Sequence, residues 1–77
     1  MVKPTRVTNS IRRLRFDRGE MTQAELAERV GVTRQTVIAI EQGRYSPSLE
    51  MAFQIAHVLS VPLEDVFQYP NHEGDAS

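Results

Sequence analysis

Residues 22–43 carry the feature that most constrains how this chain can fold, because two helical patterns are separated there by one tight stop. The segment TQAELAERV opens with a capping box, in which Thr22 and Glu25 satisfy each other's backbone N–H groups. Gly31 follows the last apolar residue and can adopt the left-handed conformation that ends a helix. Thr33 is then placed to cap a second helix over RQTVIAIEQG. The sequence therefore predicts two short helices joined by a tight turn.

Small and apolar residues at set positions allow these two helices to cross closely. Ala27 is small at the place where the helices would meet. Val32, Val37 and Ile40 are the apolar residues that would hold the second helix against the first. Gly31 accepts a backbone conformation that is awkward for other residues. This combination predicts a helix-turn-helix unit, in which the start of the second helix projects outward into the DNA major groove.

The first turn of the second helix carries hydrogen-bonding side chains with no partner nearby in the sequence. Arg34 can donate to guanine O6 and N7, and Gln35 can pair with adenine N6 and N7. Ile38 lies on the same outward side and could contact a thymine methyl group. The predicted base contacts are Arg34, Gln35, Ile38 and Ala39. Taken alone, these residues could also be a solvated helix start with one exposed aliphatic side chain.

A second set of polar residues flanks the two helices and suits the DNA backbone better than the bases. Gln23 lies at a helix start, where free N–H groups favour a phosphate. Arg44 and Ser46 follow the second helix and could reach the same strand. The predicted phosphate contacts are Thr22, Gln23, Thr33, Thr36, Arg44, Tyr45 and Ser46.

Charge is distributed unevenly along the 77 residues, although the net charge is only −1. Residues 1–18 contain six basic residues and one acidic residue, whereas residues 45–77 contain five acidic residues and no Lys or Arg. Such a chain can present a basic face while its total charge stays near zero. A merely solvated surface is the alternative interpretation of the same asymmetry.

Three further helices are predicted around this unit. NSIRRLRFDRG has Asn9 or Ser10 as its N-cap, with Phe16 as a candidate apolar residue beside Ile11 and Leu14. RYSPSLEMAFQIAHVLS predicts a broadly apolar fourth helix, with Pro47 suited to a first helical position and either Ser46 or Ser48 as a possible cap. PLEDVF predicts a short fifth helix that turns its apolar side chains inward.

The two ends of this helical region, TRVT and FQY, are β-prone and could pair as a small ribbon. The predicted fold class is therefore all-α, a compact five-helix domain to which such a ribbon can be added. We expect an N-terminal arm over residues 1–8, the domain over residues 9–69, and a disordered polar tail over residues 70–77.

The stretch from TQAELAERVGVTRQTVIAIEQG to SVPLEDVF resembles the lambda-repressor-like, Cro-type helix-turn-helix regulators of the xenobiotic-response-element family, and in particular their short stand-alone members. The resemblance covers residues 9–68 and is carried by Thr22, Gln23, Gly31, Arg34, Gln35, Thr36, Ile40, Glu41 and Gly43. It implies a five-helix DNA-binding domain, usually a homodimer, that blocks or tunes transcription at a palindromic operator. Ala39 departs from the pattern where some relatives place a glutamine, which would narrow direct base readout.

Arg15 and Glu41 form a predicted ion pair. Arg15 lies one turn after Ile11, near the core-facing side of the first helix. The carboxylate of Glu41 is unfavourable at the negative C-terminal end of a helix and needs a compensating partner. In the family that the chain resembles, the matching arginine and glutamate pair across the domain. The alternative is two unrelated surface charges.

A homodimer is predicted because one module of this size makes few base contacts. A two-fold axis would place the two recognition helices about 34 Å apart, which is one turn of DNA. The candidate interface residues are Leu63, Phe67 and Tyr69 in the C-terminal half.

Other function classes find little support in the sequence. It contains no cysteine, no Ser-His-Asp pattern and no Gly-rich phosphate loop, and neither Glu64 nor Asp65 pairs with a histidine at metal-ligand spacing. No apolar run approaches the roughly 20 residues that span a bilayer, and the start does not resemble a signal peptide. We therefore expect a cytoplasmic protein that is not an enzyme and needs no metal, cofactor or small-molecule effector. The alternative function is an antitoxin-like or other protein-interaction module with secondary DNA binding.

Overall fold

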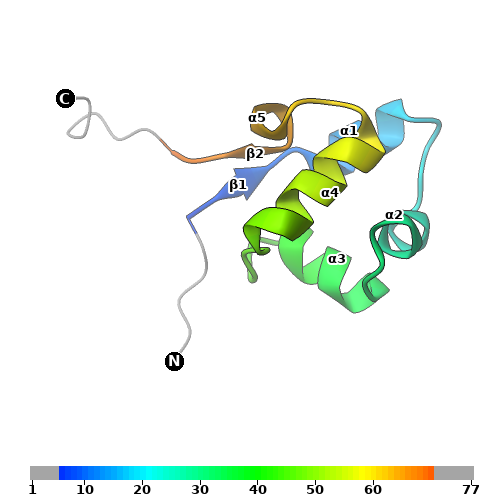
Figure 1. Ribbon diagram of the computed structural model, residues 1–77, viewed down its shortest axis with the longest axis horizontal. Helices are drawn as coiled ribbons and strands as arrows, with labels where there is room; N and C mark the ends of the chain where they lie inside the picture. The colour runs from blue at the N-terminus through cyan, green and yellow to red at the C-terminus, as the bar shows by residue number, and fades with distance from the viewer. Residues whose placement is uncertain (1–5, 71–77) are drawn as a thin grey trace.

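The computed structural model describes residues 6–70, which form five helices and a two-stranded ribbon (Figure 1). In chain order the elements are β1 (Thr8–Asn9), α1 (Ile11–Asp17), α2 (Gln23–Val30), α3 (Arg34–Glu41), α4 (Leu49–Leu59), α5 (Leu63–Val66) and β2 (Phe67–Gln68). The predicted five-helix fold is therefore confirmed. Of the tail predicted over residues 70–77, only Pro70 lies within the described residues, and the first five residues of the predicted arm lie outside them.

The ribbon brings the two ends of the described chain side by side (Figure 1). Its strands are antiparallel, with Thr8 opposite Gln68 and Asn9 opposite Phe67. The Thr8 hydroxyl also donates to the Gln68 carbonyl oxygen at 3.2 Å. The predicted pairing of TRVT with FQY is confirmed, although the paired part begins only at Thr8 and extends to Asn9.

The boundaries of α2 and α3 follow from the predicted caps. The Glu25 N–H donates to Thr22 Oγ1 at 3.0 Å, and the Thr22 N–H donates to Glu25 Oε1 at 2.8 Å, so the capping box is complete. Gly31 then ends α2 in the left-handed conformation, with φ at 91°. Thr33 caps α3 by accepting the Thr36 N–H at 3.2 Å. Local chemistry alone therefore defines the two helices and their turn.

The start of α4 uses one of the two predicted serine caps, and Pro47 is not its first residue. Ser48 is the N-cap and its hydroxyl accepts the Met51 N–H at 3.1 Å, so α4 begins at Leu49. Because Ser48 itself has an extended backbone, Pro47 lies outside the helix and only shapes its approach. The serine hydroxyl, which satisfies a free N–H group, decides this boundary.

Apolar residues from all five helices meet in one core. The buried hydrophobic residues are Ile11, Leu14, Met21, Leu26, Ala27, Val30, Val37, Ile40, Ala52, Ile55, Ala56, Leu59 and Val66. Burial of Ala27, Val37 and Ile40 agrees with the predicted close packing of α2 on α3. Phe16 is instead 65% exposed, because it follows Ile11 by five positions and so lies on the opposite side of α1.

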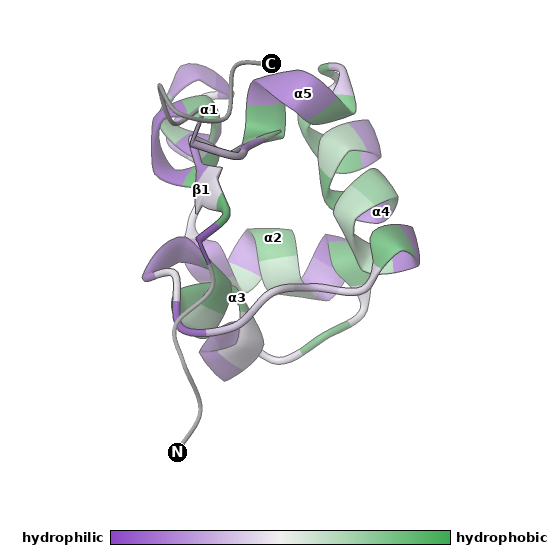
Figure 2. Ribbon diagram, turned by 90° about the vertical axis from the view of Figure 1, so that its left-hand side faces the viewer, coloured by the Kyte–Doolittle hydropathy of each residue, from purple (hydrophilic) through white to green (hydrophobic). Residues whose placement is uncertain are grey.

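The helices differ in polarity according to their place in the fold. Figure 2 shows α1 as largely hydrophilic and α4 as largely hydrophobic. Figure 1 places α3 at the end of the molecule that lies away from α5.

None of the helices within residues 6–70 is long and apolar enough to cross a membrane.

Candidate nucleic-acid interface

The start of α3 presents its polar side chains to solvent. Arg34 and Gln35 are exposed, whereas Val37 and Ile40 of the same helix are only 1% and 2% exposed. Ile38 is half-buried, as is Ala39. A helix held by such a buried stripe has one rotational setting, so its polar first turn points in a defined direction.

The two threonines at the start of α3 are partly engaged with each other. Their hydroxyl oxygens lie 3.0 Å apart, and Thr33 Oγ1 also accepts the Thr36 N–H. Each hydroxyl carries one proton, and only one of the two protons is needed for the bond between them. One hydroxyl proton therefore remains available for a phosphate oxygen.

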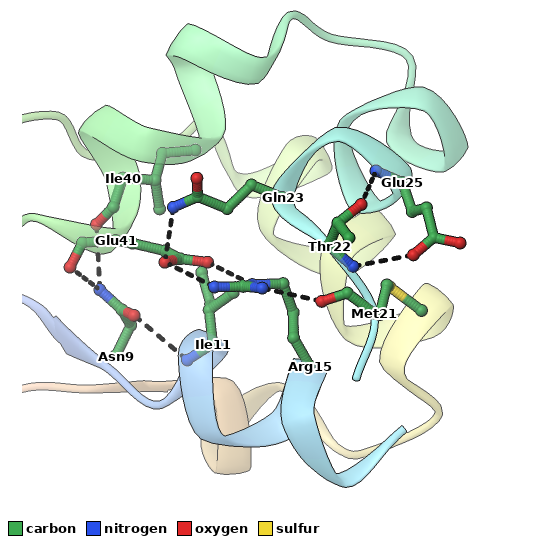
Figure 3. A network of polar contacts seen from close by, with 9 residues as sticks. All are labelled: Asn9, Ile11, Arg15, Met21, Thr22, Gln23, Glu25, Ile40 and Glu41. Atoms are coloured by element: carbon green, nitrogen blue, oxygen red, sulfur yellow. Dashed lines mark hydrogen bonds and ion pairs between the residues drawn. The ribbon is translucent and has the colours of Figure 1, made fainter. Parts of the chain in front are cut away.

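Side chains at the start of α2 make hydrogen bonds within the fold. Gln23 is half-buried, and its Nε2 donates to Glu41 Oε1 at 3.1 Å (Figure 3). Thr22 is exposed and holds the capping box with Glu25. The Thr22 backbone N–H, followed by its hydroxyl, lowers the pKa of Glu25 below its ordinary value. The carboxylate therefore remains charged beside the positive end of α2.

The structure brings Arg15 and Glu41 together in a bidentate ion pair. Arg15 Nε lies 2.7 Å from Glu41 Oε2, and Nη2 donates to Oε1 at 3.2 Å. The side chains are only 13% and 9% exposed. Arg15 Nη1 also donates to the Met21 carbonyl oxygen at 2.8 Å, and Gln23 adds a third donor to the carboxylate. The pair thus joins α1, the start of α2 and the end of α3 (Figure 3).

Asn9 is a functional candidate that the sequence suggested only as a helix cap. Its Oδ1 accepts the Ile11 N–H at 3.2 Å, which is the capping role. Its Nδ2 also donates to the Ile40 carbonyl oxygen at 3.0 Å and to that of Glu41 at 3.4 Å (Figure 3). One amide therefore caps α1 and satisfies free carbonyl groups at the end of α3. No local signal could show this second role, because the contact spans more than thirty positions in sequence.

The residues after α3 lie on the surface. Arg44 is exposed, and its Nε donates to Gln42 Oε1 at 2.9 Å. Tyr45 is 46% exposed, and Ser46 is also exposed. Among residues 6–70 the Arg44 guanidinium group makes no other hydrogen bond, which leaves further N–H groups that could bind a phosphate.

The three candidate dimer residues lie near the ribbon, apart from α3. Leu63 and Phe67 are half-buried and pack against the core. Tyr69 is 63% exposed, and the Arg6 guanidinium lies 5.9 Å from the centre of its ring. Both Leu63 and Phe67 also line a shallow apolar groove beside Leu49.

An open groove of about 1290 Å³ separates α1 from the starts of α2 and α3. Four arginines and two glutamates line it, and one of those glutamates is Glu41, which is already paired with Arg15. Gln23 and Arg34 lie on the wall formed by α2 and α3. The groove is therefore basic and adjoins the exposed first turn of α3.

Comparisons with known proteins agree with this geometry. A helix-turn-helix family model, HTH_3, matches residues 11–66. The chain is 53% identical over 53 residues to the uncharacterized HTH-type transcriptional regulator MJ0272 of Methanocaldococcus jannaschii, covering 69% of this chain and 80% of that protein. It is 51% identical over 59 residues to the uncharacterized HTH-type transcriptional regulator YgzD of Bacillus subtilis, covering 77% and 88%.

A phage protein and a solved structure extend these comparisons. The transcriptional repressor RstR of the cryptic phage CTXphi from Vibrio cholerae is 36% identical over 59 residues, which are 77% of this chain and 52% of RstR. A crystal structure from Bacteroides fragilis, of a protein to which DNA binding is ascribed, superimposes with a TM-score of 0.72 at 24% identity. It covers 80% of this chain and 98% of that one, and at this identity it shows the shared fold. With its family match and close relatives, this chain belongs to the Cro/C1-type helix-turn-helix family of DNA-binding transcriptional regulators.

Proposed function

We propose that this protein is a repressor that binds a palindromic operator as a homodimer, with α3 in the major groove. The observation that carries the proposal is the contrast across α3, where Arg34 and Gln35 are exposed and Val37 and Ile40 are buried. Side chains at the start of such a helix can reach base edges while the rear of the helix remains fixed. The proposed base contacts are Arg34, Gln35, Ile38 and Ala39.

The bonds at the far end of α3 support this function. Glu41 is held by Arg15 and Gln23, and the Asn9 amide binds the last carbonyl groups of the helix. Base readout requires a helix whose position does not change from one binding event to the next. These contacts supply that rigidity without using Arg34 or Gln35.

Phosphate contacts would set the register on the duplex. Thr22 and Gln23 lie at the start of α2, Thr33 and Thr36 lie at the start of α3, and the remaining proposed phosphate contacts, Arg44, Tyr45 and Ser46, follow the end of α3. Gln23 donates one amide proton to Glu41, and its second amide proton is available for a phosphate. Repression is supported by the similarity to RstR, which is named as a transcriptional repressor.

Homodimer formation is supported by the apolar side chains near the ribbon. Tyr69 is exposed, and Leu63 and Phe67 line a groove with Leu49, which is 69% exposed. A two-fold arrangement would set the recognition helices about 34 Å apart and so require two half-sites one DNA turn apart. Sedimentation at tens of micromolar should show a dimer. A monomer that still binds its site specifically would contradict this part of the proposal.

The test of DNA reading is a selection of bound duplexes from random DNA, followed by gel-shift titration of variants. We expect a two-fold symmetric site. Arg34→Ala and Gln35→Ala should each cost roughly 1–3 kcal/mol and relax the preference at one base pair per half-site. Gln54→Ala, at an exposed glutamine of α4, is the matched control and should change neither affinity nor preference.

Arg44→Ala should behave differently from the α3 variants, because it removes a backbone contact. It should weaken binding to operator and non-operator duplexes by a similar factor. An unchanged selected site for Arg34→Ala would refute the base contacts proposed here. Absence of any salt-sensitive binding at about 50 mM salt would contradict the DNA-binding function itself.

A further inference from the structure

Three exposed residues of α1 take no part in the base and phosphate contacts proposed above. Arg12, Arg13 and Phe16 line the basic groove from α1, whereas Gln23 and Arg34 line it from α2 and α3. All three α1 residues are exposed, and Phe16 is 65% exposed. Arg12 and Phe16 are four positions apart, so they are neighbours on one face of the helix. The exposed ring of Phe16 therefore lies beside two arginines that line the same groove.

Some of the charged side chains in this groove are already paired, and others could bind a ligand. Arg15 is neutralised by Glu41, and both are nearly buried. Within residues 6–70, no hydrogen bond or ion pair engages the guanidinium groups of Arg12, Arg13 or Arg34. Glu20 is the groove carboxylate left without a cationic partner in that range. The groove therefore holds a surplus of uncompensated positive charge on both walls.

A sugar-phosphate backbone has the chemistry that this groove fits. Phosphates match the free guanidinium groups, and the apolar face of a deoxyribose matches the ring of Phe16. The groove also adjoins the first turn of α3, so a duplex read by Arg34 would bring one strand to its mouth. The pair of Arg15 and Glu41 lies between the walls and keeps α1 at a fixed distance from α3 (Figure 3).

We propose that α1 is a second backbone-binding element, in which Arg12 and Arg13 each bind a phosphate of duplex DNA and Phe16 packs against the intervening deoxyribose. This inference rests on the proposed DNA-binding function and extends the footprint beyond the helix-turn-helix unit. Glu20 opposes the same phosphates from the edge of the groove.

The test is the salt dependence of binding to the selected operator duplex and to an unrelated duplex. The slope of log affinity against log salt concentration is negative, and each lost phosphate contact reduces its magnitude by about 0.9. Arg12→Gln and Arg13→Gln should each show this decrease, and the double variant about twice as much, with the same loss on both duplexes. Phe16→Ala should weaken binding but keep the slope, and Phe16→Leu should restore most of the affinity. Glu20→Gln should strengthen binding to both duplexes.

The matched control is the double variant Arg18→Gln with Arg29→Gln, which removes the same charge from exposed positions that do not line the groove. Its slope should equal that of the wild type. Equal slopes for the Arg12 and Arg13 variants and this control would overturn the inference, although wild-type binding would still support the proposed function. The same variants are also titrated with single-stranded DNA. If the Arg12 and Arg13 variants bind single-stranded DNA more weakly but bind both duplexes as the wild type does, the inference is overturned as well. If the wild type binds neither duplex, the proposed function and this inference both fail.

Thermal unfolding of each variant separates a binding defect from a folding defect. Because Arg12 and Arg13 are exposed, we expect melting temperatures close to that of the wild type. Phosphate ethylation interference provides a second measurement that needs only the folded wild-type protein for its baseline. We expect two phosphates per half-site at which ethylation weakens binding of the wild type. The interference at one of them should disappear in Arg12→Gln, and the interference at the other should disappear in Arg13→Gln. Unchanged interference in both single variants would refute the assignment.

Discussion

Replacing Glu41 by alanine should destabilise the fold because it leaves Arg15 as a nearly buried, unpaired cation. The carboxylate accepts three hydrogen bonds, from Arg15 Nε, Arg15 Nη2 and Gln23 Nε2. Once it is removed, the Met21 carbonyl oxygen is the remaining partner of the guanidinium group. Breaking a buried pair from one side costs about 3–5 kcal/mol, and the residual exposure of 13% and 9% reduces this to an expected 2–3 kcal/mol.

Arg15→Ala should cost a similar amount, since it leaves the Glu41 carboxylate with Gln23 alone and also removes the packing of the arginine stem. The double variant leaves neither charge unpaired. We therefore expect its destabilisation to be smaller than the sum of the single effects by about 1–2 kcal/mol. Glu41→Gln, which keeps the shape and one carbonyl oxygen, should fall between the wild type and Glu41→Ala.

The assay is urea unfolding of the four proteins at one fixed concentration, because association would couple stability to concentration. For a domain of this size, a slope near 1 kcal/mol per molar urea converts a loss of 2 kcal/mol into a midpoint shift of about 2 M. Arg15→Ala combined with Glu28→Ala is the control, because Glu28 is exposed and has no bond to Arg15. In this control double-mutant cycle, the losses of unfolding free energy in the two single variants should add up to that of the double variant within about 0.5 kcal/mol. Additivity of the Arg15 and Glu41 variants within the same margin would refute the reasoning.

Two further predictions concern the turn and the capping box. Gly31→Ala should cost about 1–2 kcal/mol through its left-handed backbone alone, since an added Cβ meets no atom within 4 Å, and Gly31→Asn should cost less in the same urea assay. The pKa of Glu25 is lowered in the folded state, chiefly by the Thr22 N–H, so its stabilising effect is present above its unfolded pKa and is lost as pH falls through the lower folded value. Glu25→Gln should therefore reduce stability at pH 7 more than at pH 3, and an equal loss at both values would contradict this linkage.

Local sequence signals were sufficient for the helix-turn-helix unit because each boundary is made by residues close together in the chain. Helix starts are capped by side chains three positions away, with Thr22 paired to Glu25 and Thr33 paired to Thr36. Gly31 ends α2 through its own backbone conformation. The apolar stripe of α3 was equally readable, since helical periodicity alone places Val37 and Ile40 on one side. At the start of α4 the local signals left Ser46 and Ser48 open as the cap, and the structure selects Ser48, so that Pro47 precedes the helix.

The tertiary structure decided how distant polar groups meet. Gln23, a predicted phosphate contact, gives one amide proton to Glu41, and Asn9 reaches carbonyl groups at the end of α3. Similarly, the position of α1 opposite α3 brings Phe16 and its neighbouring arginines to one groove. Residues within a few positions of each other predict helix caps and the buried face of a helix, because helix geometry fixes where such neighbours lie relative to one another. Which side chains share a hydrogen bond across the fold depends on how the helices pack around the core, and no local pattern encodes that packing.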